Sequence, residues 1–571
     1  MSTTLPAEPV LSSWLTREST RYARVRATTA SPAAGATTWT NQTLPAYANV
    51  QEIAYDATHA YVRSYGLASY VMGPWYLDAA KTQAFPNWPV SRVAIRRFVR
   101  NPAPAASKSL TGLGSIGMFV NGVSMFDNRD GFVWNGSAEV GQGTGYWNRD
   151  AWINEGVTFD SGFAHQEQSG NYHYHAHPPY LRNQLGDNNV YNAQNGTFTE
   201  STAGLHHSPI LAWVADGFPL YGPYGYSDPN NAASPVTRMR SGFVLRNGQN
   251  GSDALTSTRA TIPAWAQRAY GVGAGQSGPP VGATYPLGRY LEDNAYLGDL
   301  TNPSTGQKHV PGVDFDLNEW NCRFCVTPEF PNGTWAYFCT VKADGTPQFP
   351  YAIGRQYFGT PDNTAIAAMP TAGVTTVFKG GPDTVEAMTS AVPGGGDVVL
   401  TWSAVEGGTY RAEASETLAT GGWSALSGDV VATGPTASKT DGGGGAALRR
   451  FYRVTRTDLA TYATGGTTGG GGGGGSFAAA PASGARGATN LSVTFTFGAN
   501  VTPALPPANV RPASIAIGTI AGTSITRNGT AVTAVFAIPA NATPGAANVT
   551  ISFPPAGTGP SYTVNGAFTI N

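Results

Sequence analysis

Glycine and proline interrupt this chain at short intervals. Its 571 residues include 72 glycines and 41 prolines. Apolar segments such as "GSIGMFVNGVSMF" (114–126) and "SPILAWVADGFPLYG" (208–222) are broken by these residues before a long helix could form. We therefore expect a mainly β protein made of short strands, turns and ordered loops.

Glycine-rich stretches divide the chain into three parts. Residues 1–365 contain 11 of the 13 tryptophans and all eight histidines, and predict one large, loop-rich β domain. The segment 377–397, "VFKGGPDTVEAMTSAVPGGGD", is a second boundary, after which short strands in 385–460 are typical of a fibronectin III-like sandwich. The unbroken glycine run within 464–477 is typical of a flexible linker.

The last part, residues 484–571, predicts an immunoglobulin-like β-sandwich. Its segment "SITRNGTAVTAVFAI" reads as two strands joined at Asn528-Gly529, a strong hairpin pattern. Neither of the two small β-sandwich modules contains histidine or cysteine. We expect these modules to act as spacers or in attachment, and any chemistry to lie in residues 1–365.

Charge and hydropathy restrict the partners of the chain. The formal net charge is -1, and there is no basic block, so nucleic acid is not an expected partner. No run of about 18 apolar residues predicts a membrane span. The N-terminus has no apolar signal core, while the low charged content of 12% is typical of secreted proteins. We expect an extracellular or cell-surface protein whose signal has been removed.

Histidine is concentrated in one short region. Six of the eight histidines lie within 43 residues: His165, His173, His175, His177, His206 and His207. In "NYHYHAHPPY" (171–180), alternate residues of a strand would share one face, which places the histidines opposite Tyr172 and Tyr174. A His-x-His pair can give two imidazoles to one metal ion. The alternative is a polar strand face with no ligand.

A third ligand must come from elsewhere, and the "HH" pair at 206–207 is the obvious source. The segment "FAHQEQSG" around His165 looks like an exposed loop, and His177 would overshoot along the strand. We therefore expect His173, His175 and His207 to converge on one transition-metal ion, with His165 and His177 dispensable and His206 facing away.

"YHYH" (172–175), followed by "HHSPILAWVADGFPLYGPYG" (206–225), resembles the YHYH-domain family. The resemblance is clearest over residues 110–230, where "IGMFVNGVSMFDNRD" (116–130) also fits the family's pattern, and it extends less closely to about 360. It implies a domain but no reaction. The residues that match the family's motif are Tyr172, His173, Tyr174, His175, His207, Ser208, Pro209, Asp216 and Gly217.

Asp216 has two further interpretations beside that of a turn residue in "ADGFP". It could be a carboxylate ligand, or it could orient a ligand histidine through the second ring nitrogen. An imidazole-rich site suits copper, zinc, iron or nickel, and we favour copper over zinc. Calcium is a separate possibility at "VDFDLNEWN", where Asp314, Asp316 and Glu319 could offer oxygen ligands, although a solvated acidic loop explains the same pattern.

The three cysteines, Cys322, Cys325 and Cys339, lie close together in sequence. One disulfide and one free thiol is the expected arrangement. A zinc site is not expected, because three cysteines leave the usual set of four ligands incomplete. We therefore predict that these cysteines do not bind metal.

Three classes of function fit these observations. The first is a metal-dependent enzyme, with copper or zinc, that acts on an extracellular polymer. The second is a structural or matrix protein, stabilised by calcium, that stores metal or self-assembles. The third is a polysaccharide-binding surface protein that uses exposed aromatics such as Trp147, Trp152 and Trp213.

Overall fold

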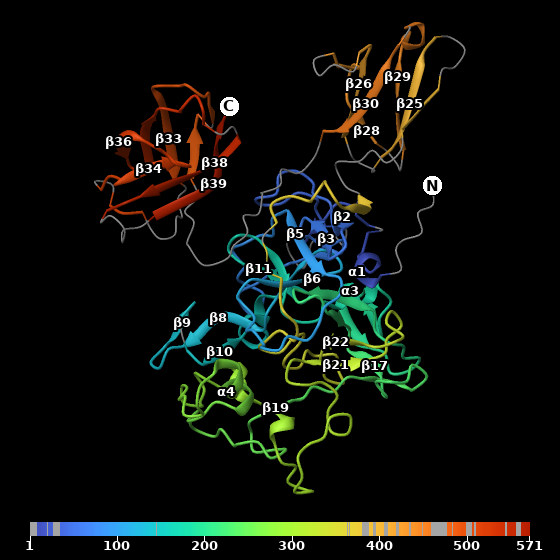
Figure 1. Cartoon of the computed structure of the whole chain (residues 1–571), viewed down its shortest axis with the longest axis vertical. Coiled ribbons are helices and arrows are strands. Elements are labelled where there is room, and N and C mark those ends of the chain that lie inside the picture. The colour runs from blue at the N-terminus through green and yellow to red at the C-terminus, as the bar shows by residue number, and fades with distance from the viewer. Residues whose placement is uncertain are drawn as a thin grey trace. The chain divides into compact units, whose positions relative to one another are not determined.

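A computed structural model describes most of the chain, in the following ranges: residues 8–16, 18–19, 21–26, 35–143, 145–362, 364, 366–379, 388–391, 396–404, 409–417, 422–432, 436–447, 449–457, 477–481, 483–497, 505–507, 510–542, 545–554 and 561–571. The secondary structure is mainly β with a few short helices (Figure 1), which confirms the predicted fold class.

The chain divides into two compact units, Met1–Thr467 and Thr468–Asn571. The predicted linker, 464–477, lies outside the described residues except for Phe477, and so does much of the predicted boundary at 377–397. A strand at Thr375–Lys379, β23, pairs with a strand near the N-terminus, at Val50–Tyr55. The N-terminal domain therefore extends beyond the predicted end at residue 365. The other domain boundaries remain predictions.

The first unit is organised around a mixed sheet of eight strands. Two neighbouring pairs, β12–β7 and β16–β22, are parallel, and the other neighbours are antiparallel. In sheet order the strands are β11 (Ala164–Gln166), β12 (Tyr172–Tyr174), β7 (Ser124–Phe126), β6 (Ser115–Phe119), β15 (Ile210–Val214), β16 (Pro219–Tyr221), β22 (Thr334–Phe338) and β21 (Cys322–Cys325). The strand β15, "ILAWV", is buried at every position, as expected for the middle of a sheet covered on both faces.

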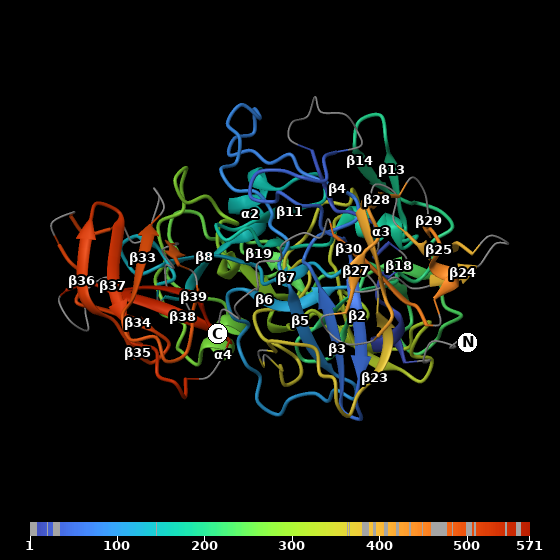
Figure 2. The ribbon, with the colours of Figure 1, turned by 90° about the horizontal axis from the view of Figure 1, so that it is seen from above.

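A second sheet of four antiparallel strands packs into the same hydrophobic core. Its order is β23, β2 (Val50–Tyr55), β3 (His59–Ser64) and β5 (Ala94–Val99), and these strands lie side by side in Figure 2. The core joins residues such as Val62 and Phe98 of this sheet to Met118 and Leu211 of the larger one. The two sheets therefore form one folded body.

Smaller elements surround these sheets. A three-stranded sheet has the order β10 (Trp147–Asp150), β8 (Arg129–Trp134) and β9 (Glu139–Gly141). The two-stranded pairs are β1 (Arg24–Val25) with β4 (Val71–Met72), β13 (Asn189–Asn192) with β14 (Thr197–Glu200), β17 (Tyr224–Tyr226) with β18 (Val236–Arg238), and β19 (Phe243–Leu245) with β20 (Asn294–Tyr296). The helices are α1 (Pro9–Ser12), α2 (Ala151–Glu155), α3 (Pro179–Gln184) and α4 (Ala264–Tyr270), with 3-10 turns η1 (Gly156–Thr158), η2 (Leu291–Asp293) and η3 (Leu297–Asp299).

The segment after β23 forms two sheets around a small core that contains Leu400, Trp402 and Tyr410. One sheet is β24 (Met388–Ala391), β25 (Val398–Ser403) and β29 (Thr436–Asp441). The other has β26 (Thr409–Ser415) paired with β27 (Ser424–Ala425), β28 (Val430–Val431) and β30 (Phe451–Arg456). The segment also has a 3-10 turn, η5 (Gly444–Ala446). This is a β-sandwich, and its fibronectin III-like character remains a prediction.

The second unit is also a sandwich, with a core that includes Phe495, Phe536 and Ile551. One sheet is β31 (Phe477–Ala480), β33 (Leu491–Phe497), β37 (Ala531–Phe536) and β36 (Thr523–Asn528). The other is β32 (Ser483–Gly484), β39 (Ser561–Ile570), β38 (Gly545–Ser552), β34 (Ser514–Ile517) and β35 (Ile520–Ala521). The predicted hairpin joins β36 to β37, with Gly529 at φ 59°, which confirms that turn.

Candidate metal centre

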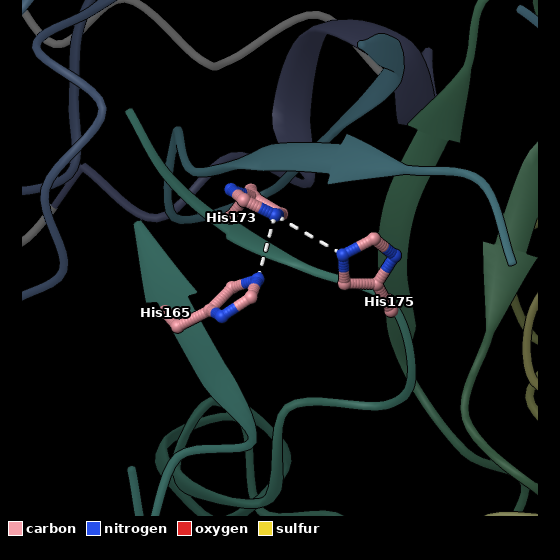
Figure 3. Close-up of side chains that lie close together, drawn as sticks. All are labelled: His165, His173 and His175. Atoms are coloured by element: carbon pink, nitrogen blue, oxygen red, sulfur yellow. Dashed lines mark hydrogen bonds between the residues drawn. The ribbon is translucent and has the colours of Figure 1, made fainter. Parts of the chain in front are cut away.

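Three imidazoles meet at one edge of the eight-stranded sheet. The Nε2 atom of His173 lies 3.1 Å from Nε2 of His165 and 3.1 Å from Nε2 of His175 (Figure 3). Among the residues that the structure describes, these three histidines are the one group of at least three His, Cys, Asp or Glu side chains that could hold a metal ion. All three are buried.

Local strand geometry brings the three rings together. The strands β11 and β12 form a tight antiparallel hairpin in which His165 pairs directly with His173. The turn closes at Gly170, which has φ 82° and whose added Cβ would lie 2.6 Å from Val90, so glycine is required there. Strand pairing places His165 beside His173. His175 is two residues after His173 and lies on the same face, so its ring is the second neighbour of His173.

The second ring nitrogen of each histidine has a partner that fixes its tautomer. Nδ1 of His173 lies 2.8 Å from the carbonyl of Asn171, and Nδ1 of His175 lies 2.6 Å from the carbonyl of Asp127. A carbonyl can only accept, so both Nδ1 atoms carry a hydrogen. Nδ1 of His165 lies 2.7 Å from the Thr158 hydroxyl, which itself donates to the Glu155 carbonyl, so this Nδ1 also donates.

The three neutral imidazoles therefore direct their Nε2 lone pairs toward one another. Such an arrangement is repulsive unless a proton or a metal cation lies between the nitrogens. In a tetrahedral site with ligand bonds of about 2.05 Å, neighbouring nitrogens are about 3.3 Å apart, close to the 3.1 Å that separates Nε2 of His173 from that of each neighbour. The Nδ1–H···O bonds are of the kind that orients ligand histidines in metal proteins. The donor set thus fits a transition metal.

Glu155, at the end of α2, supplies a carboxylate on the same side. Its Oε2 lies 3.3 Å from Nε2 of His175 and 3.7 Å from Nε2 of His165, yet it makes no hydrogen bond. The Glu155 side chain is 27% exposed, whereas those of His165 and His175 are only 7% and 3% exposed. The carboxylate therefore stands between the imidazoles and solvent, where it could act as a fourth ligand.

Aromatic rings enclose the imidazoles on other sides. Phe126 stacks on His173 with ring centroids 3.8 Å apart, and Phe159 meets His165 edge-on at 4.8 Å. Burial lowers the pKa of His165 to about 4, and lowers that of His173 well below its usual value. Burial also acts on His175, but Glu155 more than offsets it, so the pKa of His175 is raised. Glu155 thus lies beside His175 at the open side of the cluster.

His207, the expected third ligand, lies elsewhere. Its ring packs against Tyr221, Tyr226 and Phe338, and its Nδ1 contacts the carbonyl of Ser208. Tyr221 belongs to β16, four strands away from β12 in the sheet, which corresponds to about 19 Å. The expectation that His207 converges with His173 and His175 is therefore wrong. His165 is the third histidine of the cluster instead.

The remaining histidines lie outside the cluster. Nε2 of His177 lies 3.1 Å from the carbonyl of Gly345, because the chain bends at His175 and Ala176, directly after β12, and the alternation of the strand does not extend to His177. His206 is exposed while its neighbour His207 is buried, so the two rings face different surroundings as expected. Tyr172 and Tyr174 face away from the imidazoles, where their hydroxyls meet that of Tyr70.

Asp216 contacts no histidine. Its carboxylate accepts hydrogen bonds from the Tyr337 hydroxyl at 2.6 Å and from the backbone nitrogens of Phe218 and Gly359. The side chain is buried at the turn between β15 and β16, where burial raises its pKa. Asp216 is thus neither a ligand nor a partner of a ligand histidine, and the alternative interpretation as a turn residue holds.

The proposed calcium ligands are not brought together. Asp316 forms a two-pronged ion pair with Arg240, and Glu319 pairs with Arg268, which also holds Asp299. Asp314 instead accepts a hydrogen bond from the backbone nitrogen of Val310. Arginines neutralise Asp316 and Glu319, so the geometry of this segment gives a shared calcium ion no support.

The cysteines and tryptophans also differ from expectation. Cys322, Cys325 and Cys339 are free and buried, so the expected disulfide is absent. Cys322 and Cys325 are three residues apart on β21, which points them to opposite faces of the strand. Trp147 and Trp213 are only 1% and 3% exposed and belong to the core, and Trp152 is partly buried. These three rings do not form an exposed aromatic surface.

Sequence reasoning missed His165 and Glu155 for different reasons. The segment "HQEQSGNYH" contains a Gly170 turn between two histidines, and treating it as a hairpin would have placed His165 opposite His173. Glu155 reaches the site through α2 and η1, which follow from long-range packing. No spacing in the sequence relates it to the histidines.

Asp150, the N-cap residue of α2, should affect metal affinity because it stabilises the helix that ends at Glu155. Asp150 accepts a hydrogen bond from the backbone nitrogen of Ile153 at 3.2 Å and from the Tyr351 hydroxyl at 2.7 Å. We expect Asp150→Ala to cost about 1–3 kcal/mol of unfolding free energy, through loss of the cap and an unpaired buried hydroxyl. Metal affinity should fall about 10-fold or more, because α2 and η1 position Glu155 and Thr158.

Asp150→Asn is the matched control, since its amide oxygen can still cap Ile153. Thermal unfolding and metal titration on both variants measure the two effects separately. Wild-type affinity in Asp150→Ala would show that the helix does not position the ligand side.

Comparison with known proteins bears on this domain. Residues 96–350 match the family model described as YHYH protein. The match includes the hairpin with all three clustered histidines and extends beyond 110–230, so the resemblance is confirmed for this part of the chain. It leaves both C-terminal modules outside, and their immunoglobulin-like and fibronectin-like characters are not confirmed.

No curated protein matches the chain. Among solved structures, invasin, described as a bacterial integrin-binding protein, aligns at 17% identity with a TM-score of 0.12, over 32% of this chain and 40% of that chain. A TM-score this low carries no inference about fold or function. No described helix is both long enough and apolar enough to cross a membrane.

Proposed function

We propose that the YHYH-type domain is a transition-metal centre in which His165, His173 and His175 bind one ion through Nε2. The observation that carries the proposal is the convergence of three Nε2 atoms whose lone pairs are freed by Nδ1–H···O bonds. Glu155 is the fourth ligand or, when displaced, the group that borders an open position. Three protein ligands with an open fourth position are typical of catalytic sites.

Copper is the ion that we favour, ahead of zinc. Imidazole ligands suit both, together with iron and nickel, and the neutral nitrogens of this set suit a soft or borderline ion better than Mg²⁺ or Ca²⁺. When bound, copper would supply one-electron redox chemistry, and the chain would orient the ligands, exclude water with Phe126 and Phe159, and admit a reactant past Glu155.

The proposed functional class is therefore a metal-dependent oxidoreductase that is extracellular or located at the cell surface. The location rests on composition, and a polymer as substrate rests only on the presence of two β-sandwich modules after the domain. A structural or matrix protein stabilised by calcium is less favoured, because Asp316 and Glu319 pair with arginines. Carbohydrate binding is less favoured because Trp147 and Trp213 are buried.

Metal titration of the wild-type chain tests the proposal. Protein stripped with chelator and then exposed to Cu(II) or Zn²⁺ should retain one equivalent of ion by elemental analysis. The Cu(II) EPR spectrum should show coupling to imidazole nitrogens. Acidification should release the ion, because protons compete for the same nitrogens. Retention of neither ion, or copper without nitrogen coupling, would contradict the proposed centre.

A further inference from the structure

Three tyrosine hydroxyls form a buried cluster on the face of β12 opposite the histidines. The Tyr70 hydroxyl lies 2.8 Å from that of Tyr172 and 2.7 Å from that of Tyr174. Tyr172 also donates to Oδ2 of Asp160 at 2.8 Å, and the Asn121 side chain donates to Tyr174 at 3.1 Å. All four tyrosine and aspartate side chains are buried.

The direction of these hydrogen bonds follows from one proton per hydroxyl. Tyr172 gives its proton to Asp160, so it must accept from Tyr70. Tyr70 has then used its only proton, so Tyr174 must donate to it. The cluster is therefore a one-way chain of donors from Tyr174 through Tyr70 and Tyr172 to the carboxylate.

Asp160 is built to receive a proton. Besides Tyr172, its carboxylate accepts from the backbone nitrogens of Gly73 at 2.7 Å and Gly162 at 2.8 Å, which hold it in place. Burial raises the pKa of Asp160 to about 6, so it is ionised near neutral pH but takes up a proton readily. Tyr172 is also the residue before His173, so one peptide link joins the backbones of the two residues, whose Cα atoms are about 3.8 Å apart.

We propose that Tyr172 is a redox-active tyrosine that gives an electron to the metal centre while its phenolic proton passes to Asp160. This proposal rests on the metal centre proposed above and on copper as the ion. The oxidant is hydrogen peroxide. Peroxide takes two electrons, one from Cu(I) and one from Tyr172, and two protons from solvent, so that its O–O bond breaks to give two waters. Cu(II), a neutral Tyr172 radical and protonated Asp160 remain.

Tyr172 is better placed for this step than the other two phenols. Oxidation makes a phenol strongly acidic, and only Tyr172 has a carboxylate within hydrogen-bond distance. Tyr70 and Tyr174 could pass a proton only to another phenol, which is a far weaker base. The hydrogen bond from Tyr70 remains available to the oxidised oxygen of Tyr172.

Freeze-quench EPR on the full chain tests the assignment. Cu(I)-loaded protein is mixed with one equivalent of hydrogen peroxide, and wild type should show a tyrosyl radical together with nitrogen-coupled Cu(II). Tyr172→Phe should lose the radical and keep the Cu(II) spectrum. Asp160→Asn should lose it as well, because the proton acceptor is gone. Tyr174→Phe is the matched control from the same strand face, and it should keep the radical.

The outcomes separate the proposed electron and proton transfer from Tyr172, here called the relay, from the metal centre itself. Nitrogen-coupled Cu(II) without any tyrosyl radical in wild type would overturn the relay and leave the metal centre standing. A radical that persists in Tyr172→Phe and disappears in Tyr174→Phe would also overturn it. Wild-type protein that binds zinc but no copper would overturn the redox role of Tyr172 alone, and protein that binds neither ion would overturn both proposals together. Because the Cu(II) spectrum reports an intact site in each variant, a folding defect cannot be mistaken for loss of the relay.

Discussion

Replacing His173 with alanine should abolish stoichiometric metal binding. Its Nε2 is the central atom of the cluster, 3.1 Å from the Nε2 atoms of both His165 and His175. Even the loss of a group that only orients a ligand typically costs 10–100-fold in affinity, so loss of the central ligand should cost more than about 100-fold. Competition with a chelator of known affinity, with elemental analysis of the product, measures the change.

Two other buried histidines serve as controls. His177 follows the same strand but contacts the carbonyl of Gly345, and His207 lies among aromatic rings four strands away. His177→Ala and His207→Ala should keep one equivalent of ion, whereas His165→Ala should weaken binding. Loss of metal in His207→Ala with retention in His173→Ala would exclude the centre as described.

The sequence predicts those parts of the centre that depend only on the geometry of a single strand. Alternation along a strand places His173 and His175 on one face and Tyr172 and Tyr174 on the other, and the structure confirms this separation. The prediction holds for His175, the first residue after β12, but fails for His177, because the chain bends at His175 and Ala176. It also fails for His165, whose place depends on the register of a hairpin.

Long-range placement accounts for the other differences. The sequence motif at 206–217 resembles a source of ligands, yet β15 and β16 place it across the sheet from β12. Which strands become neighbours depends on packing over the whole domain, and no spacing in the chain specifies it. The mainly β class follows from composition and turn residues, whereas the eight-strand order does not.

Two residues of the longer matching segment, 206–225, have a structural role instead. The Ser208 hydroxyl donates to Asp187 at 2.6 Å, and the Tyr224 hydroxyl donates to Glu200 at 2.9 Å. Both carboxylates hold the guanidinium of Arg182, which lies on α3 shortly after the histidine strand. A sequence segment that looks like a metal site is thus part of a buried charge network.

Arg182→Met should destabilise the first unit by about 3–5 kcal/mol, because it leaves two buried carboxylates without their counter-charge. The Arg182 side chain is 0% exposed, those of Asp187 and Glu200 are 0% and 6% exposed, and Glu200 is bound through two nitrogens at 2.7 and 2.8 Å. Urea unfolding followed by tryptophan fluorescence measures the change. Eleven of the 13 tryptophans lie in residues 1–365, so the signal reports mainly on this part of the chain.

Arg268→Met is the matched control, because Arg268 also pairs with two carboxylates but is 46% exposed. Water screens its charges with Asp299 and Glu319, so the cost should stay below about 1 kcal/mol. Equal costs in the two variants would mean that burial does not set the strength of the Arg182 network. A small cost for Arg182→Met alone would mean that Asp187 and Glu200 become protonated or reach solvent when the arginine is removed. The hydrogen bonds that Ser208 and Tyr224 donate to these two side chains, rather than the ion pairs with Arg182, would then stabilise this region.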